Sequence, residues 1–131
     1  MKPREAQKRL KSMSFKRSDC AVACTLDLIG DRWTLLIIRD LFFGKRRYKE
    51  FQDSAENIPT NILAERLEKL LKAGLITKTP YQENPVRYEY QLTETGRSLG
   101  PVLQMIVNWA SEQLPGIRRS KDRKDDERRR G

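Results

Sequence analysis

The fold is decided by residues 57–76, NIPTNILAERLEKLLKAGLI. Four leucines of this stretch, at positions 63, 67, 70 and 71, recur at the spacing of one helix face. Pro59 breaks the chain before them and Gly74 ends the pattern, so we expect a helix over residues 60–72. With the leucines turned inward, a step of about 100° per residue puts polar side chains on the opposite face. These are Asn61, Glu65, Glu68 and Lys72.

Two helices and a short third one are expected before this stretch. Residues 19–30 carry apolar side chains at helical spacing and end in a glycine. Residues 31–44 form the second helix, with Asp31 as its N-cap and Gly44 as its stop. Residues 45–58 contain the short helix, which is built around two aromatic residues.

Beyond the deciding stretch, the pattern changes from helix to strand. Residues 75–82 and 86–93 flank the turn residues Glu-Asn-Pro, and the second segment alternates apolar and polar side chains, which is typical of a β-hairpin. Helical periodicity returns over residues 93–114, where Pro101 is expected to bend or break the first part. The predicted order is helix, helix, short helix, helix, hairpin, helix, in a mainly helical α+β chain.

Length and hydrophobicity favour one soluble domain. A chain of 131 residues with 37% hydrophobic residues can bury a modest core. Its most apolar stretch, residues 33–43, is interrupted by Arg39 and Asp40 and is too short to cross a bilayer. No signal peptide is visible, so we expect a cytoplasmic protein without a membrane partner.

The net charge of +9 is carried by the two ends of the chain. Residues 1–19 hold seven Lys/Arg and two acidic residues, residues 116–131 hold eight and four, and the middle is neutral. We expect a mobile basic arm over residues 1–17 and a charged, disordered tail over residues 116–131. The tail either attracts phosphates without regard to sequence or only keeps the protein soluble. Any nucleic-acid contact of the folded part must therefore rest on local charge clusters.

A short helix, a turn, a second helix and a hairpin form the winged helix-turn-helix, which we place in residues 18–115. The N-terminal end of the second helix meets base edges in such folds. The candidates for the major groove are Thr60, Asn61, Ala64 and Glu65. Asn61 can form two hydrogen bonds with adenine, and Glu65 can accept one from cytosine. The competing interpretation is a polar face that only meets water; Glu65 and Glu68 favour it, because acidic groups repel phosphates.

Basic side chains lie where contacts with a DNA backbone would be needed. One of them, Arg87, follows the tip of the hairpin, where a guanidinium could reach the minor groove or a phosphate. Others cluster before or within the short helix, which suits positioning on the backbone. These are Lys45, Arg46, Arg47 and Lys49. Arg66 lies between the buried and exposed faces of its helix, so a phosphate contact and a structural ion pair are equal alternatives.

Three separated segments resemble the HxlR-type bacterial transcription regulators, which are related to the MarR group. They are CAVACTLDLIGDRWTLLIIRDL (20–41), IPTNILAERLEKLLKAGLI (58–76) and YEYQLTETGRSLGPVL (88–103). The resemblance covers residues 18–115. It implies a homodimeric winged-helix protein that binds double-stranded DNA at a palindromic site near a promoter, often as a repressor. It also implies that N- and C-terminal helices build the dimer.

The last predicted helix supports a dimer by its own composition. Its apolar residues spread over more of the circumference than one core contact needs, so the helix must be covered on more than one side. These residues are Val102, Leu103, Ile106, Val107, Trp109 and Ala110. A second subunit is one cover, and packing by the first helix is the alternative. A two-fold dimer would hold two recognition helices about 34 Å apart, which is one turn of DNA.

Two cysteines, Cys20 and Cys24, lie one helical turn apart. Because the chain has no histidine, a Cys–His catalytic pair and a Cys/His zinc site are excluded, and two thiolates are too few for a structural zinc. Cys20 lies at a predicted helix start, where the dipole and nearby Lys16 and Arg17 would lower the pKa of a thiol, although Asp19 opposes this. In the HxlR-type family many members sense electrophiles or oxidants with a cysteine at this position. The resemblance therefore implies a redox switch at Cys20, as an alternative to a passive thiol.

The leading hypothesis is a sequence-specific, dimeric transcription regulator. A protein-interaction module that has kept the fold without specific DNA binding is one alternative. Another is a regulator with a small-molecule pocket between the dimer helices, lined by aromatic residues that could equally be core. These are Trp33, Phe42, Phe43 and Trp109. An enzyme is not expected, because there is no glycine-rich phosphate loop, no nucleophile with a base and no convincing acid pair. No cofactor or metal is expected.

Overall fold

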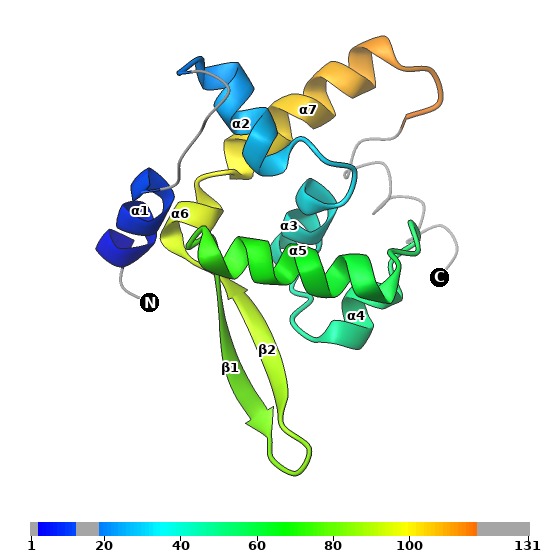
Figure 1. Cartoon of the computed structure of the whole chain (residues 1–131). Coiled ribbons are helices and arrows are strands. Elements are labelled where there is room, and N and C mark those ends of the chain that lie inside the picture. Colours follow the sequence, from blue (N-terminus) through cyan, green and yellow to red (C-terminus); the bar gives the residue numbers. More distant parts are fainter. Residues whose placement is uncertain (1–2, 13–18, 118–131) are drawn as a thin grey trace. The chain divides into compact units, whose positions relative to one another are not determined.

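The computed structural model describes residues 3–12 and 19–117, and it divides into two compact units between Ser98 and Leu99. The first unit contains α1 (Pro3–Ser12), α2 (Ala21–Ile29), α3 (Thr34–Phe42), α4 (Tyr48–Gln52), α5 (Thr60–Lys72), β1 (Ile76–Gln82), β2 (Arg87–Leu92) and α6 (Glu94–Arg97), as labelled in Figure 1. The second contains α7 (Gly100–Gln113). In the described part of the chain, no helix has the length and apolar character needed to span a membrane.

The core of the first unit is built from α3, α4, α5 and the base of the hairpin. Its fully buried side chains include Phe51 of α4 and Ile38 of α3. From α5, Leu63, Leu67 and Leu70 are buried, so the predicted inward face is confirmed. Leu71, also expected to point inward, is half-buried at the edge of this face. Phe51 meets Tyr90 of β2 edge to face, with ring centroids 6.3 Å apart, which joins the short helix to the hairpin.

The helix predictions are confirmed where the local signals were strong. α5 has the predicted bounds, after Pro59 as its N-cap residue and before Gly74 at a positive φ of 75°. α3 begins at Thr34 and not directly after Asp31. The Asp31 carboxylate nevertheless caps it, because Oδ2 accepts from the backbone N–H groups of Trp33 at 3.0 Å and Thr34 at 3.1 Å.

Two helical segments differ from the sequence prediction. Pro3–Ser12 form α1, which the sequence analysis did not identify as a helix; the Arg9 Nη1 donates to the Leu71 carbonyl at the end of α5, at 3.3 Å. The final helical stretch is broken into α6 and α7, as predicted, but Pro101 lies in the first turn of α7. Proline is tolerated there because the first amides of a helix have no intrahelical partner. Of the predicted arm (residues 1–17) and the predicted tail (residues 116–131), residues 1–2, 13–17 and 118–131 lie outside the described residues.

The hairpin extends away from α3, α4 and α5 of the first unit as a wing (Figure 1). Its antiparallel register runs from Ile76 opposite Leu92 to Pro80 opposite Tyr88, and it is irregular between Pro80 and Gln82. The base is buried and the outer half is exposed, which is the burial expected of a strand pair anchored at one end. The predicted hairpin is therefore confirmed.

Candidate nucleic-acid interface

Hydrogen bonds fix the angle of the joint between α4 and α5. The Tyr48 hydroxyl donates to the Thr60 carbonyl at 2.9 Å, and the Gln52 amide donates to the Thr60 hydroxyl oxygen at 3.0 Å. Ile58, in the connecting segment, is buried beneath them. Thr60 was predicted to meet bases; here its oxygens serve the joint, and its hydroxyl hydrogen remains available to a ligand. Tyr48 and Gln52 were not recognised from the sequence as residues that position this helix.

The first turns of α5 present the candidate base-reading residues to solvent. They are Thr60, Asn61, Ala64 and Glu65, and all are exposed. Within the described residues, the Asn61 side-chain amide has no hydrogen-bond partner, so both its oxygen and its NH₂ group are available. Glu65 is paired with the neighbouring Arg66 at 2.9 Å, although its side chain is 69% exposed. This pairing reduces the repulsion that an acidic group on this face would exert on phosphates.

Arg66 holds α5 to the start of α3. Its Nε donates to Asp31 Oδ2 at 2.8 Å, and Asp31 also accepts from the hydroxyl of Thr34. Burial opposes ionisation of Asp31, but the hydrogen bonds from Thr34, Arg66 and the backbone lower the pKa of its carboxyl well below the usual range. Of the two alternatives for Arg66, the structural ion pair is therefore present. A phosphate contact would have to share the same guanidinium.

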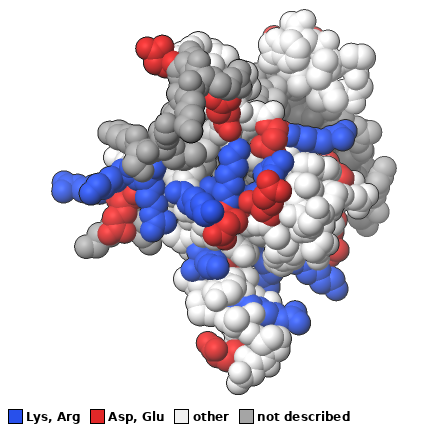
Figure 2. Space-filling view, in the orientation of Figure 1, with Lys and Arg blue, Asp and Glu red and all other residues white. Residues whose placement is uncertain are grey.

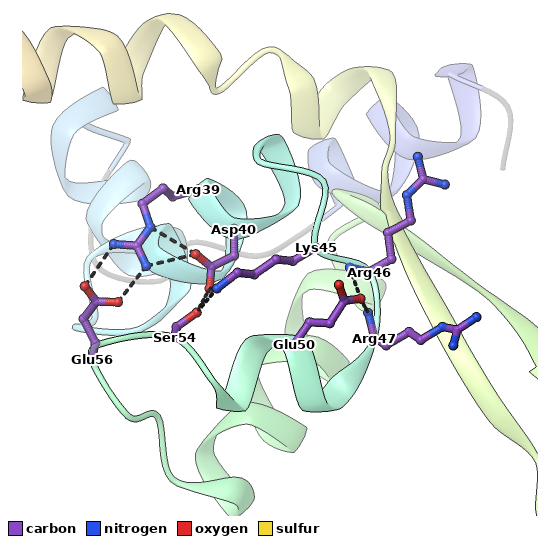
Figure 3. Close-up of polar contacts among 8 residues, drawn as sticks. All are labelled: Arg39, Asp40, Lys45, Arg46, Arg47, Glu50, Ser54 and Glu56. Carbon is purple, nitrogen blue, oxygen red and sulfur yellow. Dashed lines mark hydrogen bonds and ion pairs between the residues drawn. The ribbon is translucent and has the colours of Figure 1, made fainter. Parts of the chain in front are cut away.

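The basic cluster before α4 divides between two sides of the chain. Arg47 has an extended backbone and forms a β-bridge with Glu89, while the Tyr90 amide donates to the Arg46 carbonyl at 2.8 Å. Successive side chains of an extended segment point to opposite sides. Figure 3 accordingly shows the Arg46 and Arg47 side chains leaving the chain in different directions. The sequence grouped these two residues as one cluster; they face different surroundings.

Arg47 fastens the wing to the helices. Its Nε and Nη2 donate to Glu89 Oε1 at 3.1 and 2.9 Å, and its guanidinium lies 3.8 Å from the ring centroid of Tyr81. Glu50 Oε1 accepts from the backbone N–H groups of Arg46 and Arg47, which starts α4 and lowers the pKa of the Glu50 carboxyl. Arg47 is thus a structural residue as well as a candidate for phosphate contact.

Lys45 belongs to a polar network that fixes the end of α4 (Figure 3). Its Nζ donates to the Ser54 hydroxyl at 2.7 Å, and that hydroxyl donates to the buried carboxylate of Asp40. Arg39 donates to the other oxygen of Asp40 and pairs with Glu56 at 2.7 Å. The hydrogen bonds to Glu56 and Asp40 raise the pKa of the Arg39 guanidinium. Lys45 therefore has a structural role in the core, and its contact with a DNA backbone stays a prediction.

A groove of about 780 Å³ lies between α4 and the wing. Its cations are Arg47, Lys49 and Arg87, and its acidic residues are Glu50 and Asp53. Four tyrosines line it with them, and these are Tyr48, Tyr81, Tyr88 and Tyr90. Lys49 and Arg87 are exposed and form no ion pair within the described residues, so both charges are available to a phosphate. The sequence indicated Arg87 and Lys49, but only the fold shows that they border one groove.

The charges on the outer surface are mixed. Figure 2 shows Lys and Arg side chains interspersed with Asp and Glu over the face in view. This agrees with the neutral balance of residues 20–115. No large field of one sign covers this face, so phosphate contacts would depend on individual side chains such as those of the groove.

Cys20 occupies the N-cap position of α2 and is exposed. The backbone amides of Ala23 and then Val22 lower the pKa of its thiol, because hydrogen bonds at a helix N-terminus favour the thiolate. Cys24 is half-buried one turn further along. The described residues contain no group of three or more acidic or cysteine side chains placed to hold a metal.

Exposed apolar side chains mark two helices. On α7, the predicted interface residues Val102, Ile106 and Trp109 are exposed, while Leu103, Val107 and Ala110 are half-buried. Exposed apolar residues that the sequence analysis did not assign to an interface are Val22 and Leu26 of α2 and Met105 of α7. In α2, Val22 and Leu26 are one turn apart and 67% and 55% exposed. They form an apolar stripe that faces solvent when the chain is a monomer.

A protein-family comparison matches residues 28–118 to the HxlR-like helix-turn-helix model. A curated HTH-type transcriptional regulator of Mycobacterium tuberculosis is 42% identical over 95 residues, which are 72% of this chain and 60% of that protein. The chain therefore spans less than two thirds of the length of this relative. The match to the family model, over residues 28–118, contains α4, α5 and both strands of the wing.

Solved structures give the same result. The candidate transcription factor PA1607 superposes with a TM-score of 0.69 at 40% identity, over 82% of this chain and 75% of that one. The redox regulator HypR in its reduced form superposes with a TM-score of 0.67 at 30% identity, over 73% of this chain and 95% of that one. Both therefore share the fold described above.

Proposed function

The chain belongs to the HxlR-like helix-turn-helix family of transcriptional regulators, and we propose that it binds a palindromic operator as a homodimer and represses transcription there. The observation that carries the proposal is the exposed first turn of α5, held on a fixed joint next to the groove that Lys49 and Arg87 border. In this arrangement Asn61 and Glu65 reach base edges in the major groove. Lys49 and Arg87 contact the phosphates between the two grooves of the DNA.

The homodimer rests on the exposed apolar side chains of α2 and α7. Each subunit offers one recognition helix, and two-fold symmetry makes the operator a palindrome with half-sites about 34 Å apart. The stripe of Val22 and Leu26 and the α7 residues Ile106 and Trp109 are the surfaces that a second subunit would cover. Sedimentation of the purified protein tests this directly, and a monomer at micromolar concentration would contradict it.

Selection from a random-sequence duplex library tests the reading of DNA. We expect the wild type to enrich a palindrome. Asn61→Ala should lose about 1–3 kcal/mol on that operator and relax the preference at one position, because an adenine contact is lost. Arg87→Ala should weaken all sequences alike and reduce the slope of log affinity against log salt by about 1.

Arg32→Ala is the matched control for Arg87→Ala, because Arg32 is exposed outside the groove, over the ring of Trp33 at 5.7 Å. Its affinity and salt slope should equal those of the wild type. If no sequence is enriched, the protein is an interaction module that has kept the fold. In that case, reversing the charges of Lys49 and Arg87 should leave the complex with a protein partner intact. Arg47 is unsuitable for charge reversal because it anchors the wing.

Thiol chemistry at Cys20 is proposed as the signal. HypR, which shares the fold, is a redox regulator, and Cys20 here is exposed with a lowered thiol pKa. A quinone that adds to one thiolate should weaken operator binding by the wild type, by about 5–150-fold if its coupling is typical of allosteric effectors. Fluorescence anisotropy with labelled operator measures this. Cys20→Ser should not respond, and the matched variant Cys24→Ser should respond like the wild type; equal losses in all three proteins would contradict a switch at Cys20.

A small-molecule pocket remains a weaker alternative. The cavity beside Trp33 holds about 10 Å³, far below the ~300–1,000 Å³ of sites that hold drug-sized ligands. Phe42 lines a separate pocket of about 240 Å³ at the end of α3, which is also below this range, and Phe43 is 63% exposed.

A further inference from the structure

A second pocket lies on the side of the chain to which Arg46 points. It is formed by the end of α3, the segment before α4, the strand β2 and the helix α6, and its volume is about 240 Å³. Arg46 and Arg97 line it from segments that are far apart in sequence. Since the extended backbone sends Arg46 and Arg47 to opposite sides, this pocket is separate from the groove that Arg47 borders.

Every charged side chain in this pocket is basic. They are Lys45, Arg46 and Arg97. Lys45 is partly neutralised, because its Nζ lies 3.9 Å from the carboxylate of Asp40 and donates to Ser54. Arg46 and Arg97 have no acidic partner within residues 3–12 and 19–117. Two exposed guanidinium groups that share a pocket repel one another, and a bound anion would relieve that repulsion.

The size and the donors of the pocket indicate the class of anion. A volume of about 240 Å³ is below the ~300–1,000 Å³ typical of sites for drug-sized ligands, so a small group fits best. A guanidinium presents a planar fork of N–H donors that matches two oxygens of a phosphate. Gln91 lines the same pocket, and its side-chain amide is a neutral donor.

We propose that Arg46 and Arg97, with Lys45 in the wall, form a binding site for a phosphate group outside the DNA-reading groove. The phosphate belongs either to a DNA backbone that continues past the groove or to a free phosphate. Arg97 was not a candidate in any reading of the sequence. Arg46, which the sequence analysis grouped with Arg47, thus belongs to this second site and not to the groove. The DNA source of the phosphate rests on the proposed function.

The free-phosphate arm needs no DNA. Isotope-labelled protein is titrated with inorganic phosphate at constant ionic strength, with chloride as the replaced anion. The arginine Nε–H signals in the NMR spectrum report binding. We expect saturable shifts of the Arg46 and Arg97 signals in the wild type, and at least a tenfold weaker response, about 1.4 kcal/mol, in Arg46→Gln and Arg97→Gln. Arg32→Gln is the matched control, since Arg32 is an exposed arginine outside the pocket.

The DNA arm measures the salt dependence of binding to the selected operator. Loss of one backbone phosphate contact reduces the slope of log affinity against log salt by about 0.9. If the backbone supplies the phosphate, Arg97→Gln shows this reduction and Arg32→Gln does not. Urea unfolding of all three variants confirms that each is folded.

The two arms separate the outcomes. Saturable phosphate binding with an unchanged salt slope identifies a free anion, and a reduced slope identifies the DNA backbone. Linear, unsaturable shifts that are equal in Arg97→Gln and the wild type, together with an unchanged slope, overturn the site. Phosphate binding without any enriched DNA would leave the site in place and contradict the proposed function instead.

Discussion

Asp40→Ala is expected to lower the free energy of unfolding by about 3–5 kcal/mol, the usual result of removing one member of a buried ion pair. Asp40 is only 4% exposed, and its two oxygens accept from Arg39 and from the Ser54 hydroxyl. Without the carboxylate, Ser54 loses its acceptor and Lys45 loses its nearby negative charge, while Arg39 keeps only Glu56 as an acidic partner. The loss is a large fraction of a typical domain stability of about 5–15 kcal/mol.

Urea unfolding followed by circular dichroism measures the change. Asp53→Ala is the matched control, because Asp53 is an exposed aspartate just after α4 and should change stability by less than about 0.5 kcal/mol. If the two variants unfold at the same urea concentration, the network around Asp40 does not hold this part of the fold.

Phe51→Ala is expected to have a comparable effect, about 3–5 kcal/mol, which is typical of truncating a buried phenylalanine. The side chain is 1% exposed and packs edge to face against the ring of Tyr90. Truncation leaves a cavity in the layer that holds the joint of the helix-turn-helix. We therefore expect weaker operator binding even at temperatures where the variant is folded.

Phe43→Ala is the matched control, because it makes the same truncation at an exposed position. Phe43 is 63% exposed after α3, so its truncation removes the same atoms without opening a cavity. Thermal unfolding of both variants should show a clear drop for Phe51→Ala and little change for Phe43→Ala. Similar drops for both would mean that Phe43 is covered in solution, which would point to the second subunit.

Short-range signals in the sequence predicted most of the fold. α5 could be placed to the residue, because Pro59, the leucine spacing and Gly74 lie within one continuous stretch. The hairpin followed from the alternation of its second strand. α1 was missed because half of its residues are charged and its few apolar residues are small or widely spaced, so the stretch was interpreted as part of a mobile basic arm.

The candidate site was predicted less completely, because its geometry depends on distant partners. Arg47 meets Glu89, 42 positions away, and Arg66 meets Asp31, 35 positions away. No local pattern reveals such pairs, so the sequence left Arg66 with two alternatives and placed Arg46 and Arg47 together. The exposed face of α5 could be predicted because it follows from the helix period alone.

The bridge between the wing and the segment before α4 also affects the entropy of binding. Ordering a backbone costs about 1–2 kcal/mol per residue. β2 is already ordered at its base through the Arg47–Glu89 and Arg46–Tyr90 contacts, so this cost is met when the chain folds and not when DNA arrives. The side chains of the turn from Glu83 to Val86 are exposed beyond the paired strands, so they keep their rotamer freedom until a ligand contacts them. The base of the wing is therefore rigid and its tip is adaptable. Contacts made by the tip lose part of their binding free energy to the conformational entropy of the tip, whereas contacts made by the base do not.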